Sequence, residues 1–181
     1  MEKIYEQDRF SYFEYKPTIF KPFYIEMEPY SFRERIRFLL AYFVGYKVYY
    51  MMEGTEYIGY CVIERSGNGR YRFMGKKDII VGPIFIDEKF RGRNYAGTLN
   101  HVVLDDLGLN YNYAWNYIDK INFESGKAAP KAGFEFFSDA VIKGIGRKLI
   151  LVERNTGNFW VMRYKNIEKY KATEIKDQVV V

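Results

Sequence analysis

One stretch of the chain decides the fold: residues 79–86, IIVGPIFI, run directly into residues 87–97, DEKFRGRNYAG. The first part is apolar and β-rich, so we predict a strand over residues 78–86. Behind the basic turn, Ala96, Leu99, Val103 and Leu107 recur at helical spacing, which predicts a helix. A strand, a turn and a helix in this order leave backbone N–H groups unpaired at the helix start. The turn is therefore predicted to bind a phosphate group.

The predicted strand contains a proline near its middle, Pro83, directly after Gly82. Proline cannot donate to the hydrogen-bond ladder and is tolerated only at an edge or a bulge. We therefore predict that the strand is interrupted at these two residues.

The rest of the chain alternates strands and helices without repeats or linkers, so we treat residues 1–181 as one unit. A capping box at Ser31 and Glu34 predicts a helix up to Gly45, with an apolar stripe at helical spacing: Phe32, Ile36, Leu39, Leu40 and Phe43. The other predicted elements are strands over 46–52, 57–64, 111–121, 134–141, 149–152 and 159–164, and a short helix over 122–132. Residues 1–30 are aromatic-rich and contain three prolines, which predicts strand fragments or an irregular flap. The charged tail from Lys165 is expected to be peripheral.

The cysteine content and the absence of long apolar segments in the sequence indicate where the protein is located in the cell. The single cysteine, Cys61, excludes a disulfide within the chain and favours a cytoplasmic protein with a buried, inert thiol. The first residues lack the order of a signal peptide, and no apolar segment is long enough to span a bilayer. We therefore expect a soluble protein that does not act on a membrane.

A net charge of +5 and 19% aromatic residues are compatible with a nucleic-acid-binding module. However, the charges are dispersed and the aromatic residues occur in every predicted element. We expect the aromatic residues to fill the core and the lysines to lie on the surface, and nucleic-acid binding remains an alternative.

Two motifs resemble the GNAT superfamily of acyl-coenzyme A dependent N-acyltransferases, over about residues 46–164. In that family a strand is followed by Arg or Gln, two residues, Gly, any residue, and Gly or Ala. Residues 86–96 are similar, with Asn94 at the place of the first glycine; asparagine adopts the left-handed conformation more readily than other non-glycine residues. Asn122 to Ser125, running on to Gly133 and Phe134, is similar to the second family motif.

The resemblance implies an α+β fold: a mixed, mostly antiparallel central sheet with splayed fourth and fifth strands, flanked by helices. It also implies acetyl-coenzyme A (acetyl-CoA) as co-substrate and no metal. The residues implied in binding coenzyme A (CoA) are Ile84, Ile86, Arg91, Gly92, Arg93, Asn94, Tyr95, Ala96, Asn122 and Ser125. Taken singly, the arginines could equally solvate a helix start, Asn122 could cap a helix, and Gly133 could end one.

Acetyl transfer to an amine needs a base, a donor for the oxyanion and often an acid for the thiolate. The family's usual glutamate and tyrosine positions are Ile80 and Ala129 here. Candidate bases are Asp78, on the same strand face as Ile80, and Asp119, either of which could act through water. Candidate acids are Tyr117 first, and also Tyr113 and Tyr95.

The resemblance therefore predicts an N-acetyltransferase that is a monomer or homodimer and acts on a small amine. An amino sugar, possibly nucleotide-linked, is the predicted acceptor, because the aromatic N-terminal flap could stack on rings. Acetylation of a peptide N-terminus or lysine is one alternative. A protein that binds acyl-CoA without turnover is another.

Overall fold

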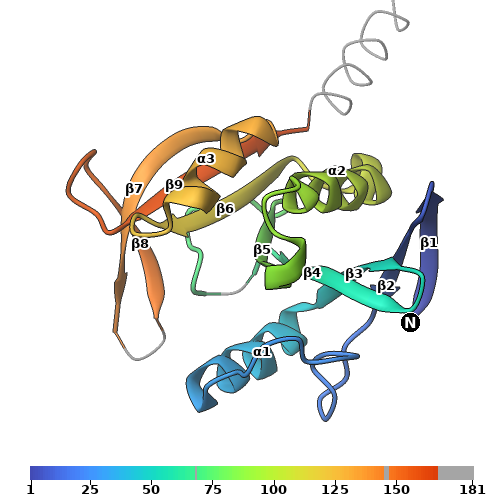
Figure 1. The fold of residues 1–181 in the computed structure, drawn as a ribbon. Coiled ribbons are helices and arrows are strands. Elements are labelled where there is room, and N and C mark those ends of the chain that lie inside the picture. The colour runs from blue at the N-terminus through green and yellow to red at the C-terminus, as the bar shows by residue number, and fades with distance from the viewer. Residues whose placement is uncertain (68, 145–146, 167–181) are drawn as a thin grey trace, which may run out of the picture.

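A computed structural model of the chain describes residues 1–67, 69–144 and 147–166 (Figure 1). Within these residues nine strands form one sheet in the order β1-β2-β3-β4-β5-β6-β9-β7-β8. Neighbouring strands are antiparallel except β5 and β6, which are parallel. The strands are β1 (Glu2–Gln7), β2 (Phe10–Tyr15), β3 (Tyr46–Glu53), β4 (Glu56–Arg65), β5 (Ile79–Ile86), β6 (Tyr113–Asp119), β7 (Glu135–Lys143), β8 (Lys148–Val152) and β9 (Phe159–Lys165).

In the described part of the chain, three α-helices cover the two faces of this sheet. Helix α1 (Phe32–Val44) lies on one face, and α2 (Tyr95–Leu107) and α3 (Phe123–Lys131) lie on the other (Figure 1). Two 3-10 turns, η1 (Glu88–Phe90) and η2 (Gly108–Asn110), flank α2. The predicted α+β class with a mostly antiparallel sheet is confirmed. No helix in the described ranges is long and apolar enough to cross a membrane.

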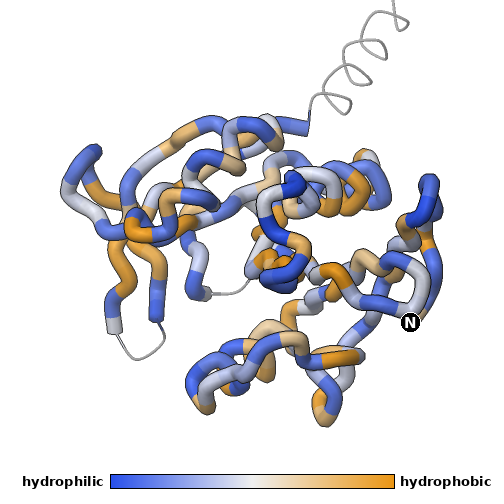
Figure 2. Tube along the Cα trace, in the orientation of Figure 1, coloured by the Kyte–Doolittle hydropathy of each residue, from blue (hydrophilic) through white to orange (hydrophobic). Residues whose placement is uncertain are grey.

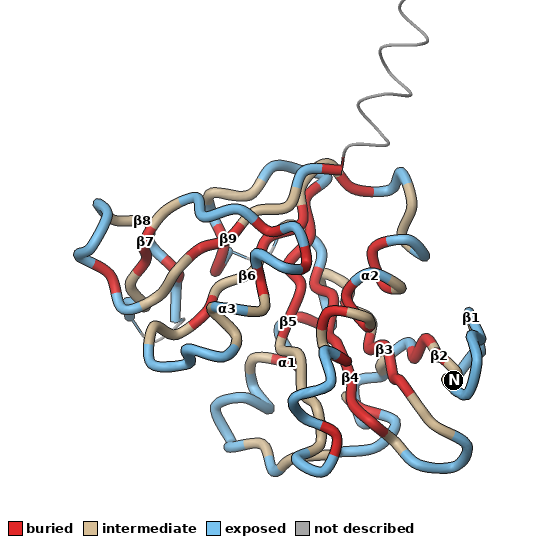
Figure 3. The backbone as a smooth tube through the Cα atoms, turned by 45° about the horizontal axis from the view of Figure 1, so that its top comes forward, coloured by how far each residue is buried: buried red, intermediate tan, exposed pale blue. Residues whose placement is uncertain are grey.

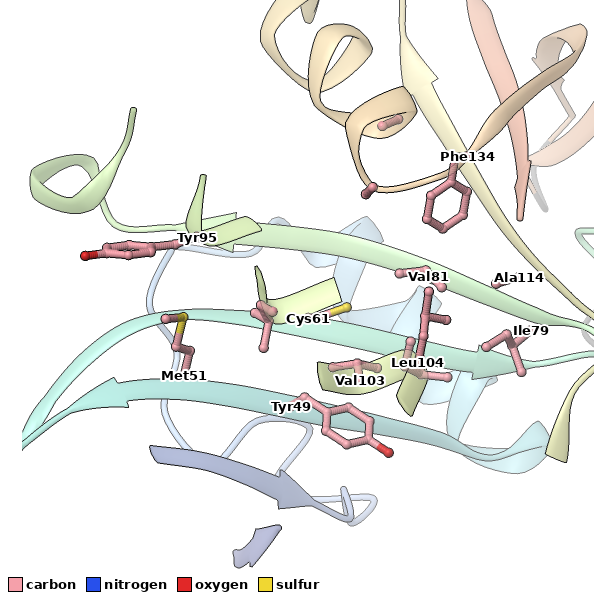
Figure 4. Packing of buried hydrophobic residues seen from close by; sticks show 14 of the residues in the cluster. Tyr49, Met51, Cys61, Ile79, Val81, Tyr95, Val103, Leu104, Ala114 and Phe134 are labelled. Carbon is pink, nitrogen blue, oxygen red and sulfur yellow. The ribbon is translucent and has the colours of Figure 1, made fainter. Parts of the chain in front are cut away.

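The core divides along the strands because successive side chains point to opposite faces of the sheet. On β4, Cys61 and Ile63 pack in the cluster that includes α2, whereas Tyr60 and Val62 pack in the cluster that includes α1. Figure 3 shows the buried residues concentrated on the central strands, and Figure 4 shows the packing on the α2 side. Cys61 is buried, as predicted, and burial raises the pKa of its thiol, which disfavours the reactive thiolate.

Helix α1 begins where the sequence predicts but buries a different face. Ser31 Oγ accepts a hydrogen bond from Glu34 N, and Glu34 Oε2 accepts one from Ser31 N at 2.8 Å, which completes the capping box. Hydrophilic and hydrophobic residues both occur along the helix (Figure 2). Yet Phe32 and Phe43, which helped to predict it, are 78% and 74% exposed, whereas Phe38 is buried. The predicted apolar stripe is thus not the packed face.

The N-terminal residues are more regular than the predicted flap. Strands β1 and β2 form a hairpin, and β2 pairs with β3 in unbroken register, from Phe10 opposite Glu53 to Tyr15 opposite Val48. The hairpin therefore lengthens the sheet at one edge. The prolines lie in the irregular segment 16–30, as the prediction of strand fragments and irregular structure requires. Of the predicted charged tail, residues 167–181 lie outside the described residues.

Strand β5 is continuous to Ile86, so the predicted interruption is wrong in form. Gly82 and Pro83 together lie opposite Val62 of β4, which makes a β-bulge rather than a break. On its other edge, β5 pairs with β6 only at Ile79 and Ile80. Beyond these two residues the parallel strands separate, which confirms the predicted splay and leaves a gap in the sheet.

Past the bulge, β5 is paired on one edge only, with β4, and Gly59 of β4 lies opposite Ile86. A Cβ at residue 59 would overlap the backbone oxygen of Phe85 and lie 3.2 Å from the Cα of Ile86. We expect Gly59→Ala to lower the free energy of unfolding by about 2 kcal/mol, because backbone atoms cannot move aside cheaply. Gly69→Ala, which meets no atom within 4 Å, should change it by less than about 0.5 kcal/mol. Equal effects in urea denaturation would contradict this account.

Candidate functional site

The gap between β5 and β6 opens into a cavity of about 510 Å³. Where the cavity passes between the two strands, it is lined by residues of the strands themselves: Val81, Gly82, Pro83 and Ile84 from β5, and Asn116 and Ile118 from β6. Because these residues sit where the ladder is missing, the cavity lies in the plane of the sheet rather than over one face.

On one side the cavity extends between α2 and α3. Its wall there consists mainly of small side chains and asparagines: Ala96, Gly97, Asn100, Asn122, Ser125, Ala128, Ala129 and Ala132. On each helix these positions recur every three or four residues, so they lie on one face. The two helices therefore present small side chains to each other and leave a narrow groove.

On the other side the cavity reaches the face covered by α1. Its wall there carries charge and aromatic rings: Glu34 and Arg37 from α1, Tyr117 and Asp119 from β6, and Phe159 from β9. Tyr117 and Asp119 share a face of β6 because they are two residues apart. The cavity thus connects a groove of small residues with a polar chamber through the sheet.

The turn before α2 has the predicted backbone geometry. Asn94 adopts the left-handed conformation, with φ of 60°, and its side chain makes no capping hydrogen bond to the helix. The first N–H with a partner inside the helix is that of Thr98, which bonds Asn94 O at 3.1 Å. The N–H groups of the first turn, including those of Ala96 and Gly97, therefore stay available beside the cavity.

The ten residues predicted to bind CoA lie in different places. Ile86, at the end of β5, is partly buried and does not line the cavity. Ile84, Ala96, Asn122 and Ser125 line the cavity, and Tyr95 does not: it is buried in the core, where its hydroxyl accepts a hydrogen bond from Arg9 Nη2 at 3.3 Å. The remaining members of the turn before α2 are exposed: Arg91, Gly92, Arg93 and Asn94. The prediction for Tyr95 concerned its backbone N–H, and the backbone of this residue does lie at the start of α2.

The backbone of the free β5 edge faces the gap. Asp87 N donates to Ile58 O of β4 at 2.9 Å. Backbone polar groups of successive residues point to opposite edges of a strand, so those of Ile84 and Ile86 point away from β4. Ile86 O accepts a hydrogen bond from Arg91 Nε at 2.9 Å. The side chain of Arg91 is therefore bonded to the strand end, although it is 54% exposed.

Asn122 serves as a helix cap, which was the alternative interpretation of this residue. Its Oδ1 accepts a hydrogen bond from Ser125 N at 3.1 Å at the start of α3. Asn122 also lines the cavity, and its Nδ2 amide takes no part in the capping hydrogen bond. The capping and binding interpretations of this residue are thus compatible.

Of the catalytic candidates, Tyr117 and Asp119 line the cavity, and Tyr113 and Tyr95 do not. Tyr117 OH accepts a hydrogen bond from Arg70 Nη2 at 2.8 Å. Asp119 Oδ1 accepts one from Ile121 N at 3.1 Å. The hydroxyl proton of Tyr117 and the second carboxylate oxygen of Asp119 are consequently not used in these bonds.

The other candidate base, Asp78, lies outside this cavity and is buried. Its Oδ2 accepts hydrogen bonds from Trp115 Nε1 and Gly75 N, both at 2.8 Å, and its Oδ1 accepts one from Tyr113 N at 3.3 Å. These bonds hold the loop before β5 against β6. A catalytic role for Asp78 remains a prediction, and the geometry favours a structural one.

The variant Asp78→Asn separates these roles. An amide nitrogen at one of the Asp78 oxygen positions would face an N–H donor, so we expect a loss of about 2 kcal/mol in unfolding free energy. Turnover per folded molecule should stay near the wild-type value. If instead the melting temperature is kept and turnover falls, Asp78 is the base; circular dichroism melting and a thiol-release assay give the two readouts.

Ile80 occupies the position of the family's usual glutamate, and a carboxylate that the sequence analysis did not select lies opposite it on the next strand. Glu64 of β4 is the direct partner of Ile80 in the β4/β5 ladder, is 1% exposed, and pairs with Arg37 Nη2 at 2.6 Å. Burial raises the pKa of the neighbouring Tyr71 phenol well above its usual value, and Tyr117 and Glu64 add to the rise. The only signal in the sequence was a glutamate near the end of an otherwise apolar strand.

No protein-family model and no curated protein sequence matches this chain. Solved structures do match it. A GNAT family acetyltransferase from Elizabethkingia anophelis, with acetyl-CoA bound, is 12% identical with a TM-score of 0.59, over 88% of this chain and 99% of its own. An IAA acetyltransferase from Bacillus cereus is 14% identical with a TM-score of 0.58, over 86% and 99%. A spermidine N-acetyltransferase from Vibrio cholerae, in complex with CoA and spermine, is 14% identical with a TM-score of 0.53, over 79% and 80%.

Proposed function

We propose that this protein, whose fold is that of the GNAT acetyltransferases, transfers an acetyl group from acetyl-CoA to a primary amine. The observation that carries the proposal is the cavity that crosses the sheet at the β5/β6 gap. A donor molecule can enter from the α2/α3 side and an acceptor from the α1 side, so that the two meet between the strands. Bringing two substrates together in this way accounts for a large share of catalysis in group transfer.

The α2/α3 side suits the coenzyme. The uncapped first turn of α2 offers N–H groups and the positive end of the helix dipole to the pyrophosphate, with Arg91 and Arg93 nearby to add charge. The backbone groups of Ile84 and Ile86 at the free edge of β5 can bond the arm that carries the thioester. Asn122 and Ser125 approach the arm from α3.

The chemistry requires two proton movements. The amine nitrogen attacks the thioester carbon and loses a proton as the C–S bond breaks, and the departing sulfur takes up a proton. We assign the first proton to Asp119, acting through water, and the second to Tyr117. The N–H of Ile84 is positioned along the gap to stabilise the oxygen that gains charge during attack.

The acceptor is a small primary amine, and we keep the amino sugar as the specific proposal. The α1 side of the cavity carries the carboxylates of Glu34 and Asp119, which can bind an ammonium or sugar hydroxyls, and the ring of Phe159, on which a sugar can stack. The N-terminal flap does not support this choice, because none of the described residues 1–30 lines the cavity. A peptide amine remains the alternative.

Two measurements test the function. Acetyl-CoA should raise the melting temperature of the protein, because a ligand that binds only the native state stabilises it. A thiol-release assay against amino sugars, nucleotide-linked amino sugars, spermidine and short peptides should then show turnover with one class of amine. The absence of any acetyl-CoA-induced shift would overturn the proposal. Firm binding without turnover on the whole panel would point to a non-catalytic acyl-CoA-binding protein.

A further inference from the structure

Helix α1, which lies on the outside of the sheet (Figure 1), carries its apolar stripe on the exposed side. Five exposed side chains form this stripe: Phe32, Ile36, Leu39, Leu40 and Phe43. By the helical repeat, the buried residues Phe38 and Ala41 lie on the opposite side of the helix, together with Glu34, which lines the cavity. A surface helix normally buries its apolar face. In α1 this arrangement is reversed, so the stripe is a surface for a partner.

The loop before α1 enlarges this apolar surface. Ile19 and Phe20, the latter 95% exposed, lie beside the stripe and line with it a groove of about 270 Å³. Stripe and loop together offer roughly 800 Å² of hydrophobic side-chain surface, since one aromatic side chain alone can bury about 150–250 Å². The largest apolar patch of a typical monomer covers about 300–600 Å². A standard protein interface buries about 800 Å² on each partner, so the surface has the size of one half of an interface.

The spacing along the stripe indicates that the partner is a helix. Four members of the stripe, which we call the α1 seam, follow one another at intervals of four, three and four residues: Phe32, Ile36, Leu39 and Phe43. This is the a/d spacing of packed helix pairs. The seam also has the same pattern from either end, with an aromatic residue at each end and two aliphatic residues between them. Such a pattern is complementary to its own copy in an antiparallel pair, as a twofold interface requires.

We propose that a second copy of this chain covers the stripe, and that the two α1 helices pack antiparallel about a twofold axis between Ile36 and Leu39. In this dimer Phe32 lies opposite Phe43 of the second copy. Ile36 lies opposite Leu39 of the second copy. Each aromatic ring and each aliphatic side chain of the seam thus meets a side chain of its own kind, and the stripe leaves water.

The charges beside the seam are compatible with this pairing. At one border Arg33 lies opposite Leu40 of the second copy, and at the other Arg35 lies opposite Tyr42 of the second copy, so like charges do not meet. Arg35 is also paired with Glu26, with N···O distances of 3.1 and 2.9 Å. A lipid surface is instead favoured by uncompensated basic charge beside an apolar helix face. The compensated charge of Arg35 therefore favours a second copy as the occupant.

The test uses two variants with opposite charges in the middle of the seam. Ile36→Glu combined with Leu39→Glu gathers carboxylates at the twofold axis, and Ile36→Lys combined with Leu39→Lys gathers ammonium groups there. In analytical ultracentrifugation at micromolar concentration, the wild type should sediment as a dimer and each variant alone as a monomer. An equimolar mixture of the two variants should form a heterodimer, because opposite charges then face each other across the axis.

Control variants separate the interface from the fold. Ile150→Glu changes an isoleucine of β8 that is also exposed, and this variant should remain a dimer. Circular dichroism should show that the charged variants are folded, since both replaced side chains are exposed. Phe32→Ser combined with Phe43→Ser adds no charge, and it should raise the dissociation constant of the dimer by at least about thirtyfold, as expected for aromatic residues central to binding.

Three results would overturn the inference. The first is a wild type that sediments as a monomer at micromolar concentration. If this monomer also binds vesicles of phosphatidylcholine and phosphatidylglycerol, the stripe serves a lipid surface. The second is a wild-type dimer that persists in the charged variants, which would place the interface on another surface. The third is a mixture of folded variants that stays monomeric, which would show that the two seams do not face each other.

Discussion

Replacing Ala96 with glutamate is expected to abolish acetyl-CoA binding while leaving the protein folded. Residue 96 lies in the first turn of α2 and borders the cavity, beside the N–H groups proposed to hold the pyrophosphate. A carboxylate here would take these donors and repel the phosphates. Two like charges about 4 Å apart near a protein surface repel by about 4 kcal/mol, which corresponds to roughly a thousandfold loss of affinity.

The folded state should tolerate this change, because a glutamate in the first turn of a helix interacts favourably with the helix dipole. Ala96→Gln is the matched control: it has the same size without the charge and should lose only a small part of the affinity. Calorimetric titration with acetyl-CoA and the melting temperature of each ligand-free variant provide the two readouts. Wild-type affinity in Ala96→Glu would place the coenzyme somewhere other than the start of α2.

The start of α2 could be predicted from the sequence because turn and helix-capping preferences depend on residues that are close together in the chain. Residue type and spacing are sufficient to predict the left-handed Asn94 and the helix that follows it. They also predict the capping residues Ser31 and Asn122. The splay of β5 and β6 followed from the family resemblance. Pro83 predicts an interruption of β5, but in the structure it forms a β-bulge opposite Val62 of β4. The bulge depends on the pairing with β4, so the sequence of β5 alone does not predict it.

The rest of the site depends on contacts between distant segments. Arg37 and Glu64 are 27 residues apart, and their pairing between α1 and β4 is visible only in three dimensions. The same applies to α1, whose packed face carries Arg37 and Phe38 rather than the apolar stripe that predicted the helix. Asp78 appeared as a candidate base from its strand position, whereas its three hydrogen-bond donors come from the preceding loop and from β6.

Replacing Tyr117 with phenylalanine is expected to lower kcat by about 10²–10⁴-fold, the range typical of losing a general acid. The Tyr117 oxygen accepts a hydrogen bond from Arg70, so the phenolic proton remains available for the departing sulfur. The affinity for acetyl-CoA should be unchanged, since the ring that lines the cavity is retained. Steady-state kinetics together with calorimetric titration separate the two quantities.

Tyr113→Phe is the matched control, because Tyr113 lies on the same face of β6 but does not line the cavity. It should keep kcat within about threefold of the wild type. Loss of the Arg70 hydrogen bond in Tyr117→Phe will cost up to about 2 kcal/mol of stability, so the rates must be compared per folded molecule well below the melting temperature. If both variants slow the reaction equally, Tyr117 acts through the packing of β6. If neither does, the sulfur takes its proton from another group or from water.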